Sequence, residues 1–421
     1  MRVTGTVRVP GDKSISHRAL ILAALADGPS RVRGLLDSAD VRSTAGVLRA
    51  LGLDVPEVAA AEIVVRGLGP RALRAPAVEL DCGNSGTTAR LVAGLVAACP
   101  FAARFTGDAS LSRRPMGRVA RPLAAMGARI TASPAGTLPM EVHGGSLRAI
   151  EWESEAASAQ VKSALLIAGA AAGVAVTVRE PARSRDHTER MLRAMGAPVE
   201  TDGATVRLAP GAPLAAVDRT VPGDPSSAAF FVALATLAQH GELLLPDVGV
   251  NPTRTGFLAV LQRMGAELAS EEQRHEGGEP VAALRVSAGR TLRGADVAAA
   301  EVPSMIDELP LLACVAARAE GETTITGARE LRVKESDRIA AVVAGLRAIG
   351  VEADESADGL RVVGAPRRPL RGRVATHGDH RLAMAFGVLA ALPGSEVAID
   401  DPDCVSVSYP AFWRDLARVT S

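Results

Sequence analysis

The chain has 421 residues, of which 48% are hydrophobic and 22% are charged, and its 47 basic and 47 acidic side chains give a formal net charge of zero. A chain of this length and composition is expected to fold into two or more globular domains. The zero net charge and the 2% aromatic content argue against nucleic-acid binding, because such surfaces are basic and base stacking needs aromatic rings.

The sequence also argues against a membrane protein and a secreted protein. The longest uncharged apolar run, residues 164–178, is too short to span a bilayer, and residues 1–5 begin a strand instead of a signal peptide. The four cysteines form no CxxC pair, so neither a disulfide framework nor a zinc site is expected. We therefore expect a cytoplasmic protein that binds no metal and is a monomer.

Lysine is scarce in this chain. Only three of the 47 Lys and Arg residues are lysines, Lys13, Lys162 and Lys334, and each lies in a dense polar cluster. A compact ammonium group with an adjustable pKa differs from a rigid guanidinium fork. The three lysines are thus candidates for positions where Arg would not serve. The alternative is that they remain by chance in a composition that favours Arg.

A helical motif recurs along the chain. Leu-x-x-(Leu/Met/Ile)-Gly occurs five times at intervals of 69 to 85 residues, ending at Gly52, Gly127, Gly196, Gly265 and Gly350. In each case an Ala/Leu/Arg-rich stretch predicts a helix, the Gly suits the left-handed residue after it, and a strand pattern follows. A sixth, truncated unit would end at residues 412–416, so six α/β units are predicted.

A coarser echo predicts two halves. Val9-Pro10-Gly11-Asp12 resembles Val221-Pro222-Gly223-Asp224, and both segments leave a strand and enter a helix. We expect the chain to cross between domains near Pro10–Lys13 and Val221–Asp224. One domain would comprise residues 13–222, and the other would comprise residues 1–12 and 223–421.

Three polar turns in the first half precede predicted helices. The segment 83–90 combines Gly, Ser and Thr with Arg90, which suits an anion at a helix N-terminus or merely a well-capped turn. Asp186 and Glu189 have capping-box spacing, which leaves Arg185 to reach a ligand. Arg114 lies at a helix start, where a guanidinium opposes the helix dipole unless an anion is near.

The second half offers carboxylates beside cations. Asp307 and Glu308 precede an apolar helix, and an N-cap explains one of them. The segment 332–338 is the densest charge cluster, with a solvated face as the alternative reading. The segment 377–381 is a weak metal signal, and an Asp379 N-cap beside Arg381 explains it better. Cations at Gly/Ser turns in a neutral protein indicate small, highly anionic ligands, with lysines and carboxylates performing proton transfers.

These motifs closely resemble the 5-enolpyruvylshikimate-3-phosphate synthase family. The resemblance covers nearly the whole chain and rests on the segments 11–18, 83–90, 114–117, 158–160, 332–338 and 379–381. It implies an α/β fold of two similar domains, each of three βαβαββ units, that face each other across an active-site cleft. It also implies transfer of the carboxyvinyl group of phosphoenolpyruvate to the 5-hydroxyl of 3-phosphoshikimate, with release of phosphate and without a cofactor.

The resemblance assigns roles by motif position. The residues implied to bind 3-phosphoshikimate are Lys13, Ser14, Arg18, Ser158, Ala159, Gln160, Arg185, Asp307 and Lys334. Those implied to bind phosphoenolpyruvate are Lys13, Gly86, Arg114, Gln160, Arg338 and Arg381. Asp307 would act as the base on the attacking hydroxyl, and Glu335, with Lys13, would protonate the methylene carbon. The family resemblance also implies inhibition by glyphosate.

The chain departs from the family pattern at three positions. Val407 stands where many members carry a lysine, and Ala159 stands where a second serine is common. Arg185 lies near the position where other members often carry a tyrosine. One alternative is the related transferase that acts on UDP-N-acetylglucosamine, which would show an asparagine after the first lysine and a loop cysteine. The other is a non-catalytic anion-binding protein of the same fold, which would be expected to lose Asp307 or Glu335.

Overall fold

The computed structural model describes residues 1–211 and 213–420, and it divides into two compact units. Unit 1 comprises Met1–Pro10, Pro222–His275 and Pro280–Ser421, and unit 2 comprises Gly11–Val221 and Glu276–Glu279. Each unit has its own hydrophobic core. The short segment Glu276–Glu279 belongs to unit 2, although the strands on either side of it belong to unit 1.

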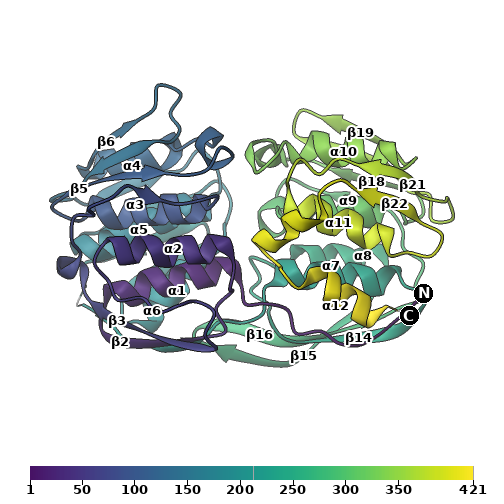
Figure 1. Ribbon diagram of the computed structural model, residues 1–421, viewed down its shortest axis with the longest axis horizontal. Helices are drawn as coiled ribbons and strands as arrows, with labels where there is room; N and C mark the ends of the chain where they lie inside the picture. Colours follow the sequence, from purple (N-terminus) through teal and green to yellow (C-terminus); the bar gives the residue numbers. More distant parts are fainter. Residues whose placement is uncertain (212, 421) are drawn as a thin grey trace. The chain divides into compact units, whose positions relative to one another are not determined.

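Four repeats in the chain share one sheet topology, strand–helix–strand–helix–strand–strand (Figure 1). In each, the first two strands pair in parallel, and the fourth strand inserts antiparallel between the second and the third. The sheet orders are β4-β5-β7-β6, β8-β9-β11-β10, β1-β14-β16-β15 and β17-β18-β20-β19. The βαβαββ unit expected from the family resemblance is therefore observed.

The two remaining repeats are modified because each lies at an end of its unit. In unit 2, β12 and β13 come from the end of the segment and pair in parallel with β2, whose other edge pairs with β3. In unit 1, the last repeat has only the parallel pair β21-β22, and the chain ends with α12 before a hairpin can form. This agrees with the truncated sixth unit predicted from the sequence.

The elements of unit 2 follow in chain order. Its helices are α1 (Lys13–Leu25), α2 (Ala39–Ala50), α3 (Gly86–Ala97), α4 (Gly117–Met126), α5 (Ala159–Ala172) and α6 (His187–Ala194). Its strands are β2 (Ala26–Arg33), β3 (Glu62–Leu68), β4 (Leu80–Asp81), β5 (Ala102–Thr106), β6 (Arg129–Ala132), β7 (Met140–His143), β8 (Ile150–Glu153), β9 (Val176–Arg179), β10 (Val199–Asp202), β11 (Thr205–Leu208), β12 (Leu214–Ala215) and β13 (Asp218–Thr220).

Unit 1 has the same kinds of element. Its helices are α7 (Pro225–Leu237), α8 (Gly256–Met264), α9 (Leu309–Ala316), α10 (Arg338–Ala348), α11 (His380–Ala390) and α12 (Phe412–Val419). Its strands are β1 (Arg2–Thr6), β14 (His240–Gly249), β15 (Glu267–Glu276), β16 (Glu279–Ser287), β17 (Asp296–Val297), β18 (Glu322–Ile325), β19 (Glu352–Ser356), β20 (Gly359–Val363), β21 (Arg371–Val374) and β22 (Glu396–Ile399). Unit 2 also has the short 3-10 helices η1 (Pro70–Ala72) and η2 (Leu111–Arg113). Unit 1 has η3 (Val302–Ser304), η4 (Arg329–Val333) and η5 (Pro402–Val407).

The first helix of each repeat forms the centre of its unit. These inner helices are α1, α3 and α5 in unit 2 and α7, α9 and α11 in unit 1, and most of their residues are buried. They are apolar nearly all round, as expected for helices that contact other elements on every side. Gly94 allows α3 to approach α5 closely, because a Cβ there would lie 2.2 Å from the Ala164 carbonyl oxygen.

The second helix of each repeat, from α2 to α10, ends at the predicted glycine. Gly52, Gly127, Gly196, Gly265 and Gly350 all have positive φ, between 86° and 118°. A residue without a Cβ adopts this conformation at little cost, which ends the helix and turns the chain into the next strand. The prediction made from the Leu-x-x-(Leu/Met/Ile)-Gly motif is confirmed.

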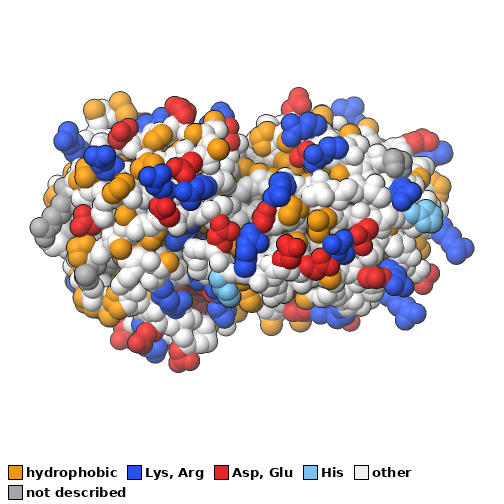
Figure 2. Space-filling model, turned by 90° about the horizontal axis from the view of Figure 1, so that it is seen from below, with side chains coloured by type: hydrophobic (Ala, Val, Ile, Leu, Met, Phe, Trp, Pro, Cys, Tyr) orange, Lys and Arg blue, Asp and Glu red, His pale blue; other side chains and the backbone are white. Residues whose placement is uncertain are grey.

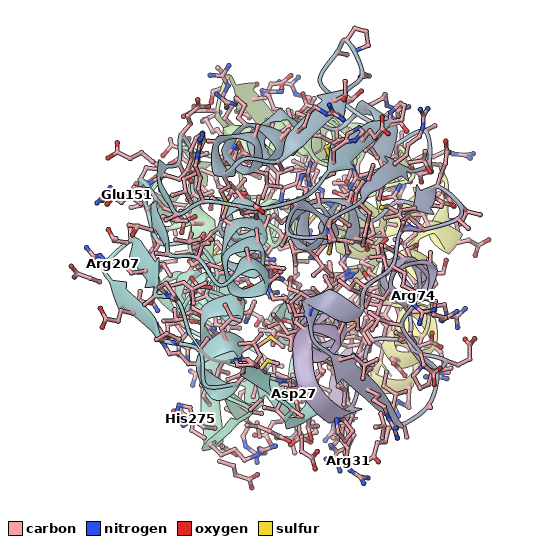
Figure 3. All side chains as sticks on the ribbon, turned by 90° about the vertical axis from the view of Figure 1, so that its left-hand side faces the viewer. Asp27, Arg31, Arg74, Glu151, Arg207 and His275 are labelled. Atoms are coloured by element: carbon pink, nitrogen blue, oxygen red, sulfur yellow. The ribbon has the colours of Figure 1, made fainter. Side chains whose placement is uncertain are left out.

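Charged side chains of both signs cover the outer surfaces. Asp27, Arg31, Arg74, Glu151 and Arg207 of unit 2 are exposed and point away from its core (Figure 3). Acidic and basic groups also alternate over the face shown in Figure 2, and neither sign forms a continuous field there. The mixture of charges on this face agrees with the zero net charge of the chain.

Candidate active site

Most of the predicted site residues lie in the first turns of helices, both inner and outer, or in the turns just before them. The Val-Pro-Gly-Asp echo marks two of these starts, since Asp12 caps α1 by accepting from Ile15 N at 2.9 Å and Asp224 caps α7 by accepting from Ser226 N at 2.7 Å. Ser85 likewise caps α3. Each such start presents backbone N–H groups and the positive end of the helix dipole, which favour an anion.

In unit 2, the start of α1 carries three of the predicted residues. Lys13 Nζ lies 3.1 Å from Asp40 Oδ2, and Arg185 Nη1 donates to Ser14 Oγ at 3.4 Å. Arg18 is buried and donates to the Ser14 carbonyl oxygen, Thr188 Oγ1 and Ser163 Oγ. Burial lowers the pKa of Arg18 to about 10, so the side chain stays cationic at neutral pH. Arg18 therefore stabilises the first turn of α1, which carries Lys13 and Ser14.

A second group of unit 2 joins the starts of α3 and α5. Gln160 donates from Nε2 to Thr87 Oγ1 at 3.0 Å, and Arg90 Nη1 donates to Gln160 Oε1 at 2.7 Å. Arg114 Nη2 donates to Asn84 Oδ1 at 2.7 Å. Gly86, the first residue of α3, lies close to both guanidinium groups. A Cβ there would be 2.7 Å from Arg90 Nη1 and 3.6 Å from Arg114 Nη1.

A buried hydrogen-bonded chain links α1 to the cap of α3. His17 Nδ1 lies 2.6 Å from Thr44 Oγ1, which lies 2.6 Å from Thr88 Oγ1, and Thr88 Oγ1 donates to Ser85 Oγ at 2.7 Å. Burial lowers the pKa of His17 to about 3. The imidazole is therefore neutral over the physiological range and serves as a structural link.

The buried neutral His17 predicts a pH dependence of stability. Between pH 6.5 and 3 the unfolded chain binds a proton that the folded protein does not, so the free energy of unfolding falls as pH falls, by up to about 1.4 kcal/mol per pH unit. His17→Gln should flatten this slope, and His275→Gln, at an exposed position, should not. Urea unfolding at pH 7.5 and 5.0 measures it, and identical slopes in all three proteins would contradict the assignment.

In unit 1, three cations surround the Asp307 carboxylate. Arg338 Nη1 and Lys334 Nζ lie 3.4 and 3.5 Å from Oδ1, and Arg381 Nη2 lies 3.9 Å from Oδ2. The residues come from the turn before α9, the turn before α10, and the first turns of α10 and α11. The structure thus brings together four residues that are separated by up to 74 positions in the sequence.

Arg338 is the buried centre of this group. Its Nε lies 2.8 Å from Asp379 Oδ2, its Nη2 lies 2.7 Å from Glu335 Oε2, and the residue is only 1% exposed. Burial opposes its charge, but Asp379 and Glu335 raise its pKa above the usual value for Arg. Burial likewise opposes ionisation of Asp379, but Arg338 lowers its pKa below the usual range. Asp379 also caps α11 as predicted, by accepting from Arg381 N at 3.0 Å.

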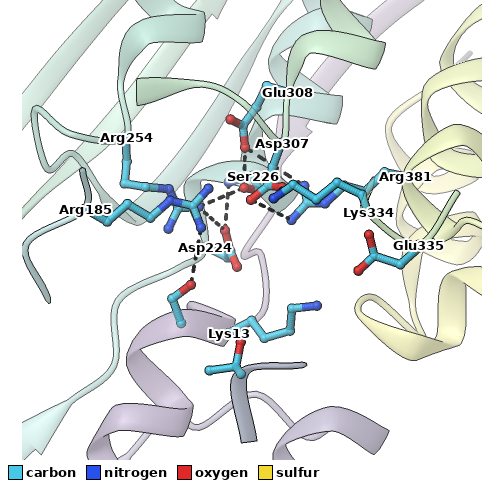
Figure 4. Close-up of polar contacts among 12 residues, drawn as sticks. Lys13, Arg185, Asp224, Ser226, Arg254, Asp307, Glu308, Lys334, Glu335 and Arg381 are labelled. Atoms are coloured by element: carbon cyan, nitrogen blue, oxygen red, sulfur yellow. Dashed lines mark hydrogen bonds and ion pairs between the residues drawn. The ribbon is translucent and has the colours of Figure 1, made fainter. Parts of the chain in front are cut away.

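A polar cluster next to Asp307 was not predicted as part of the site (Figure 4). Arg254, in the turn before α8, is buried and donates to Ser226 Oγ at 2.8 Å and to Asp224 Oδ1 at 3.2 Å. Ser226 Oγ in turn donates to Glu308 Oε1. The chain has only two asparagines, Asn84 and Asn251, and this scarcity could have indicated the turn. Asn251 Oδ1 accepts from Thr253 N and fixes the chain just before Arg254.

Carboxylates outnumber cations by one in the unit 1 cluster around Asp307 and Arg254. Arg254, Lys334, Arg338 and Arg381 face five carboxylates, those of Asp224, Asp307, Glu308, Glu335 and Asp379. When all nine groups are ionised, they carry a net charge of −1. In unit 2, by contrast, Arg18 and Arg90 donate to hydroxyl, amide and carbonyl oxygens. An anion entering the unit 1 cluster competes with carboxylates for the cations.

Two capping predictions are wrong. Asp186 stands at the N-cap of α6 but makes no capping hydrogen bond, because Arg183 and Arg190 pair with its carboxylate at 2.6 and 2.8 Å. Glu189 pairs with the buried Lys162 at 2.9 Å instead of completing a capping box. At α9, Glu308 occupies the N-cap position without a side-chain capping bond and binds Ser226 instead.

The structure shows no metal site in residues 1–211 and 213–420, where no three His, Cys, Asp or Glu side chains are arranged to hold an ion. In the same described part of the chain, the helices are too short or too polar to cross a membrane. Cys82, Cys99, Cys314 and Cys404 are free thiols. The helix starts and turns described above offer Lys, Arg, Asp and Glu side chains together with backbone N–H groups.

The chain is similar to one family along its whole length. A family model for EPSP synthase (3-phosphoshikimate 1-carboxyvinyltransferase) matches residues 1–416. A 3-phosphoshikimate 1-carboxyvinyltransferase of Halorhodospira halophila is 52% identical over 416 residues, or 99% of this chain and 93% of the relative. The enzyme of that name from Xylella fastidiosa is 49% identical over 415 residues, or 98% and 90%.

A solved structure gives the same result for the fold. EPSP synthase from Acinetobacter baumannii has a TM-score of 0.87 and 41% identity, with 100% of this chain and 96% of that chain covered. The names of this structure and of the two relatives agree with the motifs at the helix starts and with the repeated βαβαββ topology. The chain belongs to the EPSP synthase family.

Proposed function

We propose that the protein is a 3-phosphoshikimate 1-carboxyvinyltransferase, which transfers the carboxyvinyl group of phosphoenolpyruvate to the 5-hydroxyl of 3-phosphoshikimate and releases phosphate. The observation that carries the proposal is the Asp307 cluster, in which a carboxylate able to act as a base lies 3.4–3.9 Å from three cations able to bind an anion. Family membership over residues 1–416 supports it. The reaction would serve the synthesis of aromatic amino acids through the shikimate pathway.

The proposed residues for 3-phosphoshikimate centre on the start of α1 and the turns near it. Ser14 and Arg185 are hydrogen-bonded to each other, and Arg18 supports the Ser14 turn. An anionic group bound here would face a helix N-terminus and two cationic side chains, which is a favourable setting for phosphate. The full proposed set is Lys13, Ser14, Arg18, Ser158, Ala159, Gln160, Arg185, Asp307 and Lys334.

The proposed residues for phosphoenolpyruvate are a second set with more guanidinium groups. Its members are Lys13, Gly86, Arg114, Gln160, Arg338 and Arg381. Planar guanidinium groups bind carboxylate and phosphate oxygens in pairs, which orients the small substrate as well as holding it. Gly86 supports this set, because the absence of a Cβ leaves the space that Arg90 and Arg114 border.

Proton transfer is assigned to Asp307, Glu335 and Lys13. Asp307 would accept the proton of the attacking hydroxyl, and Lys334 and Arg381 pair with its carboxylate before the transfer. Glu335, held by Arg338 at 2.7 Å, would deliver a proton to the methylene carbon with the help of Lys13 and take one back during elimination. Each positioned proton transfer typically contributes about 10²–10⁴ in rate.

The two alternatives are less well supported. The relatives at 52% and 49% identity are named 3-phosphoshikimate 1-carboxyvinyltransferases, not transferases of UDP-N-acetylglucosamine. A non-catalytic protein of this fold would have no need for Asp307 and Glu335, and both are held by cations here. The test is phosphate release from phosphoenolpyruvate. It should depend on 3-phosphoshikimate and should not occur with UDP-N-acetylglucosamine.

Turnover should survive removal of metal ions. The proposed proton transfers use side chains alone, so dialysis against a chelator should leave the rate of phosphate release within about twofold of the untreated protein. The measurement compares chelated enzyme with and without added Mg²⁺ or Zn²⁺. Loss of activity that only a metal restores would contradict the mechanism.

We further propose that residues 13–222 and residues 1–12 with 223–421 are two domains, with crossovers near Pro10–Lys13 and Val221–Asp224. The compact units that change at Pro10/Gly11 and Val221/Pro222 support this division. The proposed protein is a cytoplasmic monomer that acts on small molecules and binds neither nucleic acid nor membrane. The mixed charges of its surface support the absence of a nucleic-acid partner.

A further inference from the structure

Lys162, the third of the scarce lysines, lies in a buried ion cluster of unit 2. Its Nζ is 2.8 Å from Glu180 Oε2 and 2.9 Å from Glu189 Oε1, and all three side chains are about 1% exposed. Burial would lower the pKa of Lys162, but Glu189 and Glu180 more than offset it and raise the pKa above its usual value. The side chain is therefore a permanent cation between two carboxylates.

Glu180 also binds the two segments that flank the cluster. Its Oε1 accepts from Ser158 N at 2.9 Å, at the start of α5. Its two oxygens accept from Ser184 Oγ at 2.7 and 2.8 Å, and Oε2 also accepts from Ser184 N at 3.4 Å. Ser158 belongs to the proposed 3-phosphoshikimate set, and Ser184 directly precedes Arg185 of the same set.

Stability alone does not explain a buried cluster of this kind. Taking charges out of water is costly, and apolar side chains of similar volume often stabilise a protein as well as a buried ion pair does. A carboxylate that accepts from two separate loops, however, fixes the distance between them in a way that an apolar group cannot. Lys162 contributes an ion pair that helps to hold the Glu180 carboxylate toward Ser158 and Ser184.

We propose that Glu180, held by Lys162, is a positioning residue that sets the spacing between Ser158 and Arg185 for binding of 3-phosphoshikimate. This inference rests on the proposed function. Glu180 does not contact the substrate itself; it acts through Ser158 and through the Ser184–Arg185 segment. Displacement of a binding group by about 1 Å can cost about 10²-fold, so the effect of losing this anchor should be measurable.

Two variants of identical composition test the proposal. Lys162→Met with Glu180→Met removes the anchor and leaves Glu189, whereas Lys162→Met with Glu189→Met leaves the anchor and removes the other carboxylate. Both variants keep one buried carboxylate, so their net charges are equal. Arg179→Met is the control at the position next to Glu180, because Arg179 pairs with Glu151 and Glu153 at the surface.

The measurements are KM for each substrate, kcat, the dissociation constant for 3-phosphoshikimate by calorimetry, and the urea midpoint. We expect the variant without Glu180 to raise KM and the dissociation constant for 3-phosphoshikimate by about tenfold or more. KM for phosphoenolpyruvate should change by less than about threefold. The variant that retains Glu180 should lose clearly less, because Ser158 N and Ser184 Oγ still donate to the carboxylate after Lys162 is removed. The Arg179→Met control should stay within about threefold of the wild-type values.

The outcomes separate this inference from the function on which it rests. Equal losses in the two double variants, no loss in either, or a larger loss without Glu189 would overturn the positioning role. Rescue is a further check, because Glu180→Gln with Lys162→Met restores an acceptor for Ser158 N and should recover part of the affinity. A wild-type protein that neither binds 3-phosphoshikimate nor releases phosphate would instead refute the proposed function.

Discussion

Asp307→Asn and Glu335→Gln are each expected to lower turnover by about 10²-fold or more. Both carboxylates lie within ion-pair distance of Arg338, and the proposed mechanism assigns each of them a proton transfer. The amides keep the shape of the side chains but cannot act as bases. Steady-state phosphate release gives kcat, and calorimetry gives the affinity for 3-phosphoshikimate.

The control for both variants is Glu355→Gln. Glu355 belongs to the same unit and pairs with Arg332 at 2.9 Å, but it is exposed and has no proposed role in binding or catalysis. Its activity should stay within about twofold of wild type, as expected for a surface ion pair. For Glu335→Gln, a loss of affinity for 3-phosphoshikimate equal to the loss of rate would identify Glu335 as a binding residue.

Gly86→Ala is expected to raise the inhibition constant for glyphosate far more than the Michaelis constant for phosphoenolpyruvate. The added methyl group would lie 2.7 Å from Arg90 Nη1, so the guanidinium must shift away from its hydrogen bond with Gln160. A longer anion fills the space near residue 86 more completely than phosphoenolpyruvate does and should lose more. Gly86 does not have positive φ, so an alanine can adopt the same backbone conformation without backbone strain.

Inhibition curves for wild type and Gly86→Ala measure this effect. Gly117→Ala is the matched control, because Gly117 also begins a helix and a Cβ there would meet nothing within 4 Å. We expect the wild-type protein to be sensitive to glyphosate. The alternative is that Val407, which provides no cation, already makes the natural protein tolerant. Equal insensitivity of wild type and Gly86→Ala would show that Gly86 is not next to phosphoenolpyruvate.

Patterns local in the sequence predicted the repeats well. The Gly that ends each outer helix depends on helix periodicity and on one residue with positive φ, and both are visible within a few positions. The caps at Asp12, Ser85 and Asp379 follow from equally local chemistry. Local signals of this kind do not depend on which distant segment packs against them.

Contacts between distant segments defeated the same reasoning. Glu189 has the spacing of a capping box with Asp186, but Lys162 on another helix holds its carboxylate. The Asp186 carboxylate was lost to local competition, because Arg183 and Arg190 lie within four positions of it. The scarcity of lysine identified positions where Arg would not serve, yet it did not distinguish a buried ion cluster at Lys162 from the substrate-binding role proposed for Lys13 and Lys334. The five carboxylates of the unit 1 cluster could not be counted in advance, because they come together only in the folded chain.

The N-terminal strand has a consequence for how the protein is made. β1 pairs in parallel with β14, where Arg2 lies opposite His240, and Val3 forms a bridge with Thr420 near the other end of the chain. A ribosome therefore releases β1 first but supplies its partners only after more than 230 further residues. Unit 2, whose segment Gly11–Val221 is nearly all of it, is complete in the nascent chain well before unit 1 can close. Because domains generally fold as they emerge, β1 must wait unpaired while the Gly11–Val221 part of unit 2 forms, and the bridge between Val3 and Thr420 can form only after α12 has been made.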